Sequence, residues 1–185
     1  LRISVKREVG GVVSNYLHDH LNVGDEIKVT APCGDFVLNQ NDRPLVLVTG
    51  GVGITPAISM LNASVTSGRE IIFVHAALNS GAHAFKNHVD ALAQDHQHLK
   101  TIYVYNEPLA DDAPHATGFV SEALLADCLP NNRDVDFYFL GPKPFMQAVN
   151  GYAKALAIPE AQVHFEFFGP LQDLNASEDG QPVAA

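Results

Sequence analysis

The chain has 185 residues, 46% of them hydrophobic, and a formal net charge of −10. This apolar fraction excludes a disordered chain, and the length suits one domain or one and a half. A nucleic-acid partner would require a basic face, which this acidic sequence does not show. No apolar run is long enough to span a bilayer and no signal peptide opens the sequence, so we expect a cytoplasmic protein.

Cysteine and histidine spacing argues against a metal centre. Cys33 and Cys128 are far apart, which excludes a cysteine-ligated iron–sulfur cluster within this chain and favours a reducing compartment. Two pairs of histidines are spaced by two residues, at His18 and His20 and at His96 and His98. Alternate side chains point the same way only on a strand, and both pairs lie in helical or loop surroundings. We therefore predict no metal site.

The first 42 residues contain short segments typical of β-strands. Residues 2–7 and 24–29 alternate apolar and polar side chains, and residues 36–38 form a short apolar run. Between them, residues 13–19 predict one short helix capped by Ser14 or Asn15. Strands at this spacing indicate part of a small antiparallel β-barrel. Because the chain starts within a strand and without a methionine, we expect a fragment of a longer protein.

From residue 43 to residue 174 the pattern changes to alternating strands and helices. We expect five strands, at residues 45–48, 70–74, 101–105, 136–140 and 163–168. We expect helices at residues 56–65, 84–93, 121–128 and 144–157. This alternation predicts an α/β fold, a doubly wound five-stranded parallel sheet with right-handed crossovers. Residues 175–185 are small and polar without periodicity, and we interpret them as a disordered tail.

A glycine-rich turn follows the first of these five strands. It consists of Gly50, Gly51, Val52, Gly53, Ile54 and Thr55. Glycines let the backbone approach a ligand closely, and a helix start offers unpaired N–H groups and partial positive charge. Together they favour a cradle for a phosphate, although the spacing matches neither the Rossmann fingerprint nor the P-loop. The alternative is a turn that needs glycine only for packing.

A second turn, beginning Gly141-Pro142, follows the fourth strand. Open α/β sheets bind ligands at the carboxyl ends of their strands, where the strand order reverses. Two such turns facing one crevice predict a nucleotide site. His75 ends the second strand at this edge, either as a hydrogen-bonded strand-end residue or as a nucleotide contact.

With both turns located, the set of motifs resembles the ferredoxin–NADP reductase superfamily and, within it, the reductase part of bacterial flavohaemoglobins (nitric oxide dioxygenases). The motifs that carry the resemblance lie at residues 5–19, 31–36, 50–56, 75–85, 141–146 and 166–170. They occur in the expected order over nearly the whole chain to Leu174. The resemblance implies an FAD-binding barrel, of which residues 1–42 are the C-terminal part, followed by an NAD(P)H-binding domain.

The resemblance also implies roles for individual residues. Gly50 to Thr55, with Gly141 and Pro142, would hold the NAD(P)H pyrophosphate. The FAD pyrophosphate would contact Gly11, Val12, Val13 and Ser14. The isoalloxazine ring would lie beside Phe167, Phe168, Gly169 and Pro170. Phe168 would cover the flavin and move aside for nicotinamide, while the charge of Glu166 would influence the flavin potential, so these two are the expected catalytic residues.

The implied activity is hydride transfer from NAD(P)H to FAD, then electron transfer to haem in an upstream globin domain for nitric oxide detoxification. That globin domain and the family's flavin-stacking Arg-x-Tyr-Ser segment are absent from this sequence. No arginine follows the second strand closely, which favours NADH over NADPH. Two alternatives stay open: a reductase of the same superfamily that serves another acceptor, such as an oxygenase, and a nucleotide-binding fragment without catalysis.

Overall fold

The computed structural model describes residues 2–168, and the chain divides into two compact units. The first unit ends at Val37 and the second begins at Leu38. Each unit is described by itself below. Within residues 2–168, every helix is too short or too polar to cross a bilayer.

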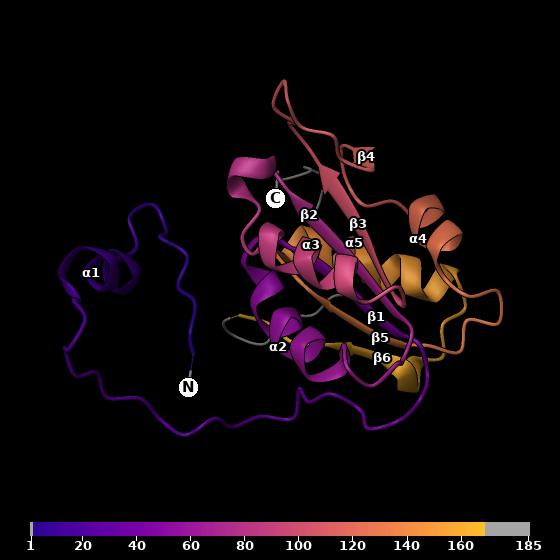
Figure 1. The fold of residues 1–185 in the computed structure, drawn as a ribbon, viewed down its shortest axis with the longest axis horizontal. Helices are drawn as coiled ribbons and strands as arrows, with labels where there is room; N and C mark the ends of the chain where they lie inside the picture. Colours follow the sequence, from indigo (N-terminus) through magenta and orange to yellow (C-terminus); the bar gives the residue numbers. More distant parts are fainter. Residues whose placement is uncertain (1, 169–185) are drawn as a thin grey trace. The chain divides into compact units, whose positions relative to one another are not determined.

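The second unit is built on a six-stranded parallel sheet with the order β4-β3-β2-β1-β5-β6 (Figure 1). The strands are β1 (Leu45–Gly50), β2 (Ile71–Ala77), β3 (Leu99–Tyr105), β4 (Ala116–Thr117), β5 (Asp136–Leu140) and β6 (Val163–Phe165). The predicted doubly wound parallel sheet is confirmed, with one strand more than expected. Strand β4 was missed because its two residues are too few to produce a periodic pattern.

Four helices cover the two faces of this sheet. They are α2 (Ile54–Ser64), α3 (Lys86–Asp95), α4 (Glu122–Cys128) and α5 (Lys143–Ala155). Helices α2 and α3 lie on one face, and α4 and α5 on the other (Figure 1). Between residues 38 and 168 the unit also has three 3-10 turns: η1 (Gly51–Gly53), η2 (Ser80–Ala82) and η3 (Glu160–Gln162). All four helices were predicted, with each end within two residues of the observed one.

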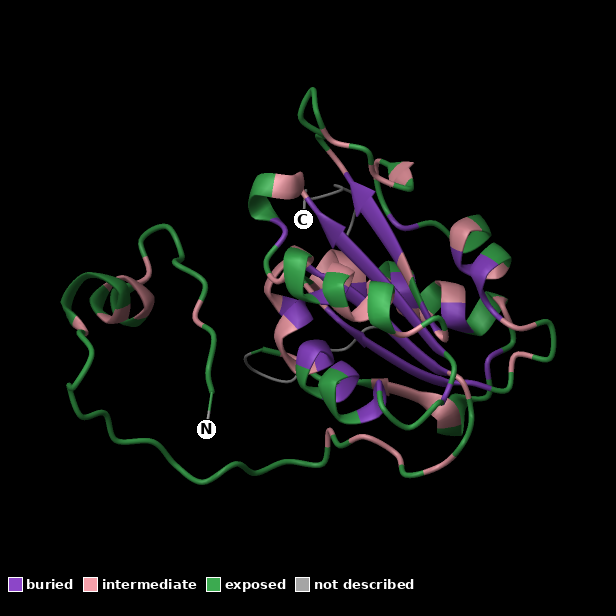
Figure 2. Ribbon diagram, viewed as in Figure 1, coloured by how far each residue is buried: buried purple, intermediate pink, exposed green. Residues whose placement is uncertain are grey.

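The central strands are buried on both faces, as the purple strands of Figure 2 show. Every residue of β1, β2 and β5 is buried. Parallel sheets require this cover, and their strands are therefore continuous apolar runs rather than alternating ones. Val46 and Val48 belong to the core on the α4 and α5 side, where they join Met146 and Val149. The apolar run that begins at Leu45 is thus the centre of the unit.

A buried ion pair joins the amino ends of the strands. Arg69 Nη2 donates to Asp136 Oδ2 at 2.6 Å, and both side chains are almost completely buried. Arg69 Nε also donates to the carbonyl oxygen of Arg43, and Arg69 Nη1 donates to the carbonyl oxygen of Asn39 at 3.3 Å. One guanidinium therefore attaches the chain that enters β1 to the first residue of β5.

The first unit does not contain the predicted strands. Residues 2–7, 24–29 and 36–38 are irregular, so the expected barrel strands are not formed among the described residues. A β-strand is stabilised by hydrogen bonds to a neighbouring strand, and these segments pair with none in the structure. Apolar side chains that a barrel would bury, such as Ile3 and Val29, are instead exposed.

The short helix of the first unit is confirmed as α1 (Val12–His20), but its predicted cap was wrong. Gly11 is the N-cap residue and makes no side-chain capping bond. Ser14 Oγ accepts from the backbone N–H of Glu8 at 3.2 Å, and the Asn15 amide donates to the carbonyl oxygen of Glu8 at 3.1 Å. Both side chains therefore attach the helix to the preceding turn instead of capping it.

The last strand is shorter than predicted, because β6 ends at Phe165. Residues 166–168 leave the sheet, so strand alternation does not govern which way Glu166 and Phe168 point. Phe165, the last residue of β6, is 41% exposed and so is not a core residue. Its ring lies 5.2 Å from that of Phe139 and 5.7 Å from that of Phe167, on the border of the core.

The substitution Asp136→Ala tests the buried ion pair. It leaves the Arg69 guanidinium buried without its carboxylate, and we expect the free energy of unfolding to fall by about 3–5 kcal/mol in urea titrations. The matched control is Asp134→Ala, which removes the exposed ion pair with Arg43 and costs about 1 kcal/mol or less. Equal losses in the two variants would contradict a special role for the buried pair.

Candidate nucleotide-binding site

The strand order of the second unit reverses between β1 and β5. From β1 the chain proceeds through β2 to β3 in one direction, and it returns to the other side of β1 for β5 and β6. Thr49 and Leu140 are paired near the carboxyl ends of the two strands. The turn after β1 and the turn after β5 therefore begin side by side, as the sequence predicted for a ligand site.

The glycine turn packs directly against the end of β5. A Cβ atom added at Gly53 would lie 2.4 Å from the carbonyl oxygen of Leu140 and 2.8 Å from the nitrogen of Gly141. Gly51 has a φ of 53°, in the left-handed region that favours glycine. Thr55 Oγ1 donates to the carbonyl oxygen of Val52 at 3.1 Å and closes the turn. Packing against β5 therefore explains Gly53, in agreement with the alternative that the turn needs glycine only for packing. The positive φ of Gly51 sets the conformation of the turn.

One aromatic ring joins the two turns. A Cβ atom added at Gly50 would lie 3.2 Å from the ring of Phe145, and one added at Gly141 would lie 2.5 Å from it. The ring of Phe145 therefore lies against the backbone of both turns. Gly50 and Gly141 are needed because any side chain would displace this ring.

Two helix N-termini start at this edge of the sheet. Helix α2 begins after Gly53 and α5 begins after Pro142, and neither has a side-chain cap. The first N–H groups of a helix have no intrahelical partner, and the helix dipole adds partial positive charge there. Ile54 N–H donates back to the carbonyl oxygens of Gly51 and Val52, and Pro56 and Pro144 have no N–H. The edge therefore offers the remaining N–H groups and the positive potential of two helix ends, without acidic side chains in either first turn. This arrangement suits an anion such as a pyrophosphate.

A cavity of about 230 Å³ adjoins the second turn on the α5 side of the sheet. Its lining is largely apolar and comes from the ends of β2, β3 and β4 and from α5: Ala76, Ala77, Asn106, Gly118, Phe119, Val120, Pro142, Pro144, Phe145, Ala148, Val149 and Tyr152. Apolar and aromatic walls with few polar groups are typical of small-molecule sites. Asn106 and Tyr152 supply the polar side chains of the lining.

Sequence reasoning missed several of these residues. Asn106 and Phe119 were not predicted to line a site, although Asn106 follows the carboxyl end of β3, where the rule for open sheets already pointed. Tyr152, on α5, packs beside the core and also lines the cavity. No sequence signal distinguishes a core-facing aromatic residue from one that lines a cavity.

The predicted flavin-side residues of the second unit follow β6 at the same edge of the sheet. Glu166 is exposed, Phe168 is 57% exposed, and Phe167 packs against the core. Gly169 and Pro170 lie outside the described residues. An exposed aromatic ring beside a carboxylate suits a surface that meets a cofactor or another domain, so the assignment of Glu166 and Phe168 stays a prediction.

The predicted FAD-pyrophosphate residues belong to the first unit. Gly11 precedes α1, and Val12 and Val13 are exposed, Val12 by 84%. Ser14 is bound to the backbone of Glu8. The start of α1 has no side-chain cap, so its N–H groups have the same anion-binding character as those of α2 and α5.

The strand-end interpretation of His75 agrees with the structure. His75 is buried, and its Nδ1 lies 2.7 Å from Thr49 Oγ1. It is not among the residues that line the cavity, so the structure does not favour a nucleotide contact. Within residues 2–168, no group of three or more His, Cys, Asp or Glu side chains could hold a metal ion.

A parallel sheet with a glycine turn and two helix N-termini at its switch point is the arrangement of a nucleotide-binding domain. Comparison with known families agrees, because residues 47–151 match the family described as the oxidoreductase NAD-binding domain. The chain belongs to this family, as the NAD-binding reductase part of a flavohaemoglobin-type protein. The predicted resemblance is therefore confirmed.

Individual relatives support the same assignment. The chain is 54% identical over 175 residues to a flavohemoprotein of Burkholderia sp. (strain TH2), and 55% identical over 173 residues to one of Pseudomonas putida. Each match covers 94% of this chain but only 44% of the relative. The chain thus spans less than half the length of the flavohemoproteins it matches.

Solved structures extend the likeness to the fold. The flavohem-like FAD/NAD-binding domain of nitric oxide dioxygenase from Vibrio cholerae is 35% identical, with a TM-score of 0.80, and the match covers 90% of this chain and 70% of that one. The cytochrome b5 reductase domain of Ulva prolifera nitrate reductase is 20% identical, with a TM-score of 0.76, over 85% of this chain and 64% of that one. The second likeness shows the fold alone.

The contact between the two turns is tested by Gly53→Ala. The backbone at Gly53 has a φ of −60°, which any residue adopts, so the added methyl group acts by steric overlap with the end of β5. We expect the free energy of unfolding to fall by about 1–3 kcal/mol. In the control Gly151→Ala, the new Cβ has open space inside α5, and stability should rise by about 0.5–1 kcal/mol. Thermal and urea unfolding of both variants measure the contrast.

Proposed function

We propose that this chain is the nucleotide-binding reductase part of a flavohaemoglobin, which takes hydride from NAD(P)H to FAD and passes electrons on to haem for nitric oxide dioxygenation. The observation that carries the proposal is the meeting of two uncapped helix N-termini and a glycine turn at the switch point of the sheet. Because the relatives are more than twice as long, haem, the globin domain and nitric oxide detoxification belong to the whole protein.

The dinucleotide would lie along the carboxyl edge of the sheet. Gly50 to Thr55, with Gly141 and Pro142, would hold the pyrophosphate through backbone N–H groups. The largely apolar cavity beside α5 would take the adenine, with Asn106 as a polar partner. Among residues 2–168, no lysine or arginine lines this cavity, which supports NADH over NADPH, because a 2′-phosphate favours a cationic partner.

The nicotinamide end would meet the flavin near the end of β6. Phe168 would cover the flavin face, and Phe167, anchored in the core, would hold the segment that continues to Gly169 and Pro170. Glu166 would place a negative charge near the ring and so oppose additional charge on it. Gly11, Val12, Val13 and Ser14 would contact the FAD pyrophosphate at the start of α1.

When bound, the two cofactors supply the redox chemistry, namely hydride donation by nicotinamide and its acceptance by flavin; the protein binds and orients them. The apolar cavity walls and the ring of Phe145 exclude water from the bound nucleotide. The wide spacing of the two cysteines supports a cytoplasmic, reducing location.

Two other functions are separated from this one by experiment. A nucleotide-binding fragment without catalysis is favoured by the irregular first unit, which lacks the strands of a flavin-binding barrel. If added FAD is bleached by NADH in the presence of this chain under argon, the fragment is catalytic. If NADH binds without bleaching, catalysis requires the longer protein. A reductase for another acceptor would be indicated by a parent protein that lacks a globin domain.

The cavity assignment is tested by Ala148→Glu. Ala148 is exposed on α5 and lines the cavity, so the substitution places a charged side chain there at little cost to folding. We expect at least tenfold weaker NADH binding, measured by NADH fluorescence, which the absence of tryptophan leaves free of interference. Wild type should bind NADPH more weakly than NADH.

The matched control is Ala155→Glu, an exposed position of the same helix outside the cavity, which should bind NADH like wild type. Equal affinities of Ala148→Glu and wild type for NADH would place the adenosine elsewhere. A clear preference for NADPH would overturn the assignment of the coenzyme.

The flavin-side assignment is tested in the full-length protein by Phe168→Ala. Loss of the covering ring should change the absorption spectrum of bound flavin and slow hydride transfer from NADH, measured by stopped-flow reduction. Phe165→Ala is the control, because that residue belongs to the border of the core and is not placed against the flavin. An unchanged spectrum and an unchanged rate in Phe168→Ala would contradict the assignment.

A further inference from the structure

Two buried histidines lie in contact outside the cavity, on the opposite face of the sheet. The rings of His75 and His83 are 4.4 Å apart between centroids and tilted by 40°. His75 Nδ1 lies 2.7 Å from Thr49 Oγ1, and His83 Nδ1 lies 2.8 Å from Tyr105 Oη. Among the described residues, neither Nε2 atom has a hydrogen-bond partner, although both are buried. We refer to these two residues as the histidine pair.

The geometry of the histidine pair excludes a metal bridge between the two Nε2 atoms. With metal–nitrogen distances of about 2.0–2.1 Å and tetrahedral or wider angles, the two ring centroids would be roughly 5 Å or more apart. The observed 4.4 Å is shorter than this separation, so a single metal ion does not bridge the two rings.

Burial keeps the histidine pair uncharged. It lowers the pKa of His75 to about 3, with a further contribution from His83. The pKa of His83 falls to about 4, chiefly through burial and then through the positive charge of Lys86, against an opposing contribution from Asp90. Two neutral rings can pack at van der Waals distance, whereas two imidazolium ions would repel each other.

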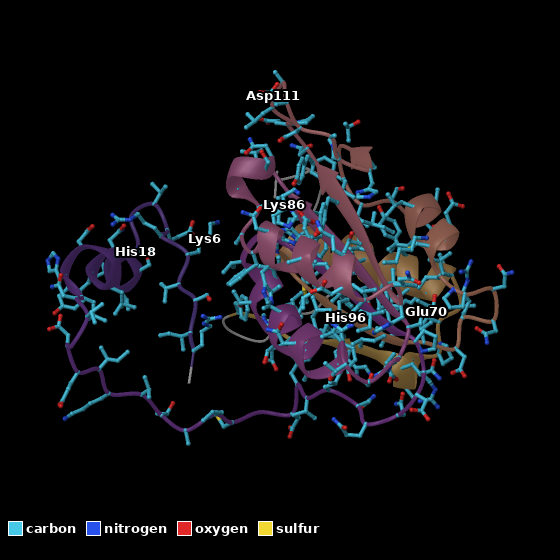
Figure 3. The ribbon with its side chains drawn as sticks, viewed as in Figure 1. Lys6, His18, Glu70, Lys86, His96 and Asp111 are labelled. Atoms are coloured by element: carbon cyan, nitrogen blue, oxygen red, sulfur yellow. The ribbon has the colours of Figure 1, made fainter. Side chains whose placement is uncertain are left out.

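The charged groups around the histidine pair would stabilise a proton on either ring only weakly. Lys86, labelled in Figure 3 at the start of α3, lies 2.6 Å from Asp90. Tyr103 Oη also donates to Asp90, at 2.7 Å. The Asp90 carboxylate is thus already engaged by two partners. On the β3 side, Tyr105 contacts His83, and His115 Nδ1 accepts from the backbone N–H of Tyr103.

The histidine pair holds the connection between β2 and α3, residues 78–85, which we call the β2–α3 segment. His83 lies within it and is its buried residue, whereas His75 belongs to the sheet beneath. Phe85, at the end of the segment, has a φ of 62°, a strained conformation for a non-glycine residue that the surroundings must enforce. Release of His83 would let this strain relax.

The β2–α3 segment is also connected to the rim of the cavity. It begins directly after Ala76 and Ala77, which line the cavity. Asp112 Oδ2 accepts from the backbone N–H groups of Ser80, at 3.1 Å, and of Leu109, at 2.9 Å. The loop after β3, which starts with the cavity residue Asn106, is thereby attached to the β2–α3 segment.

We propose that His75 and His83 are positioning residues of the nucleotide site. As an uncharged pair they hold the β2–α3 segment, and with it the cavity rim, in the form that binds the dinucleotide. A proton on either ring releases the segment. This inference rests on the proposed function, since it assumes that a dinucleotide occupies the cavity. Neither residue touches the ligand; both act through the segment.

The direction of the pH effect follows from the two pKa values. His83 is neutral in the closed segment but titrates near the ordinary histidine pKa of about 6.5 once the segment opens, whereas His75 stays in strand β2. The open form therefore binds more protons in acid, and opening is favoured as the pH falls below about 6.5. The released His83 increases the opening constant about tenfold per pH unit, until the pKa of the closed form is reached.

Hydrogen exchange tests the histidine pair without any ligand. The backbone N–H groups of Ala82 and His83 donate to Asn79 and Ser80 within the segment, and their protection reports its opening. Between pH 7.5 and pH 5.0 we expect wild-type protection factors to fall about 30-fold or more, the value for one released histidine. The double variant His75→Asn/His83→Asn, which keeps a polar atom near each Nδ1 position, should show no such fall.

Two further variants serve as controls for the exchange experiment. His88→Asn, at an exposed position of α3, should behave like wild type. His115→Asn should also retain the pH dependence, because His115 contacts Tyr103 and not the pair. The proposal is overturned if the double variant loses protection in acid as wild type does, or if His115→Asn alone abolishes the effect.

A second measurement tests the connection to the nucleotide, with ADP-ribose as the probe at pH 7.5. If binding requires the closed segment, ADP-ribose at 100 times its Kd should raise the protection of the same two amides about 100-fold. Unchanged protection despite binding would overturn the positioning role. Absence of ADP-ribose binding by calorimetry would overturn the proposed function, while the pH experiment would still decide whether the histidine pair holds the segment.

Discussion

The parallel pairing of β1 with β2 on one side and with β5 on the other is the constraint on which the rest of the second unit depends. Strands β2 and β3 are added on one side of β1, and β5 and β6 on the other. The turns that follow β1 and β5 are therefore neighbours. The close approach of Gly53 to Leu140 is possible only in this register. Helix starts, cavity and aromatic cover are all arranged around that contact.

Much of this unit could be predicted from the sequence, because its strands are two-sided apolar runs separated by helices. The turn at Gly50 to Thr55 was located correctly, and so was its partner at Gly141. Their glycines serve packing as well as ligand approach, and no sequence pattern separates these roles: only the structure shows that the ring of Phe145 lies against Gly50 and Gly141. The sequence motifs located the two turns, whereas the register of the strands places these turns next to each other.

The errors have identifiable physical causes. Residues 2–7 and 24–29 have the alternation of strands, but alternation describes which face is apolar and not whether a neighbouring strand exists to pair with. β6 ends at Phe165, and the aromatic residues that follow do not continue the pairing: Phe167 packs against the core, whereas Phe168 is exposed. The cavity residue Asn106 and the contact of His75 with His83 depend on side chains far apart in sequence, which periodicity does not report.

The lengths of the edge strands have a consequence for self-association. The four inner strands of the sheet have five to seven residues, whereas β4 has two and β6 has three. Unpaired edges are where sheets recruit strands from other molecules, and very short edge strands leave few backbone groups for such recruitment. The short edge strands β4 and β6 thus protect the long apolar strands of the core from intermolecular β-pairing. This protection reduces aggregation when the protein is concentrated.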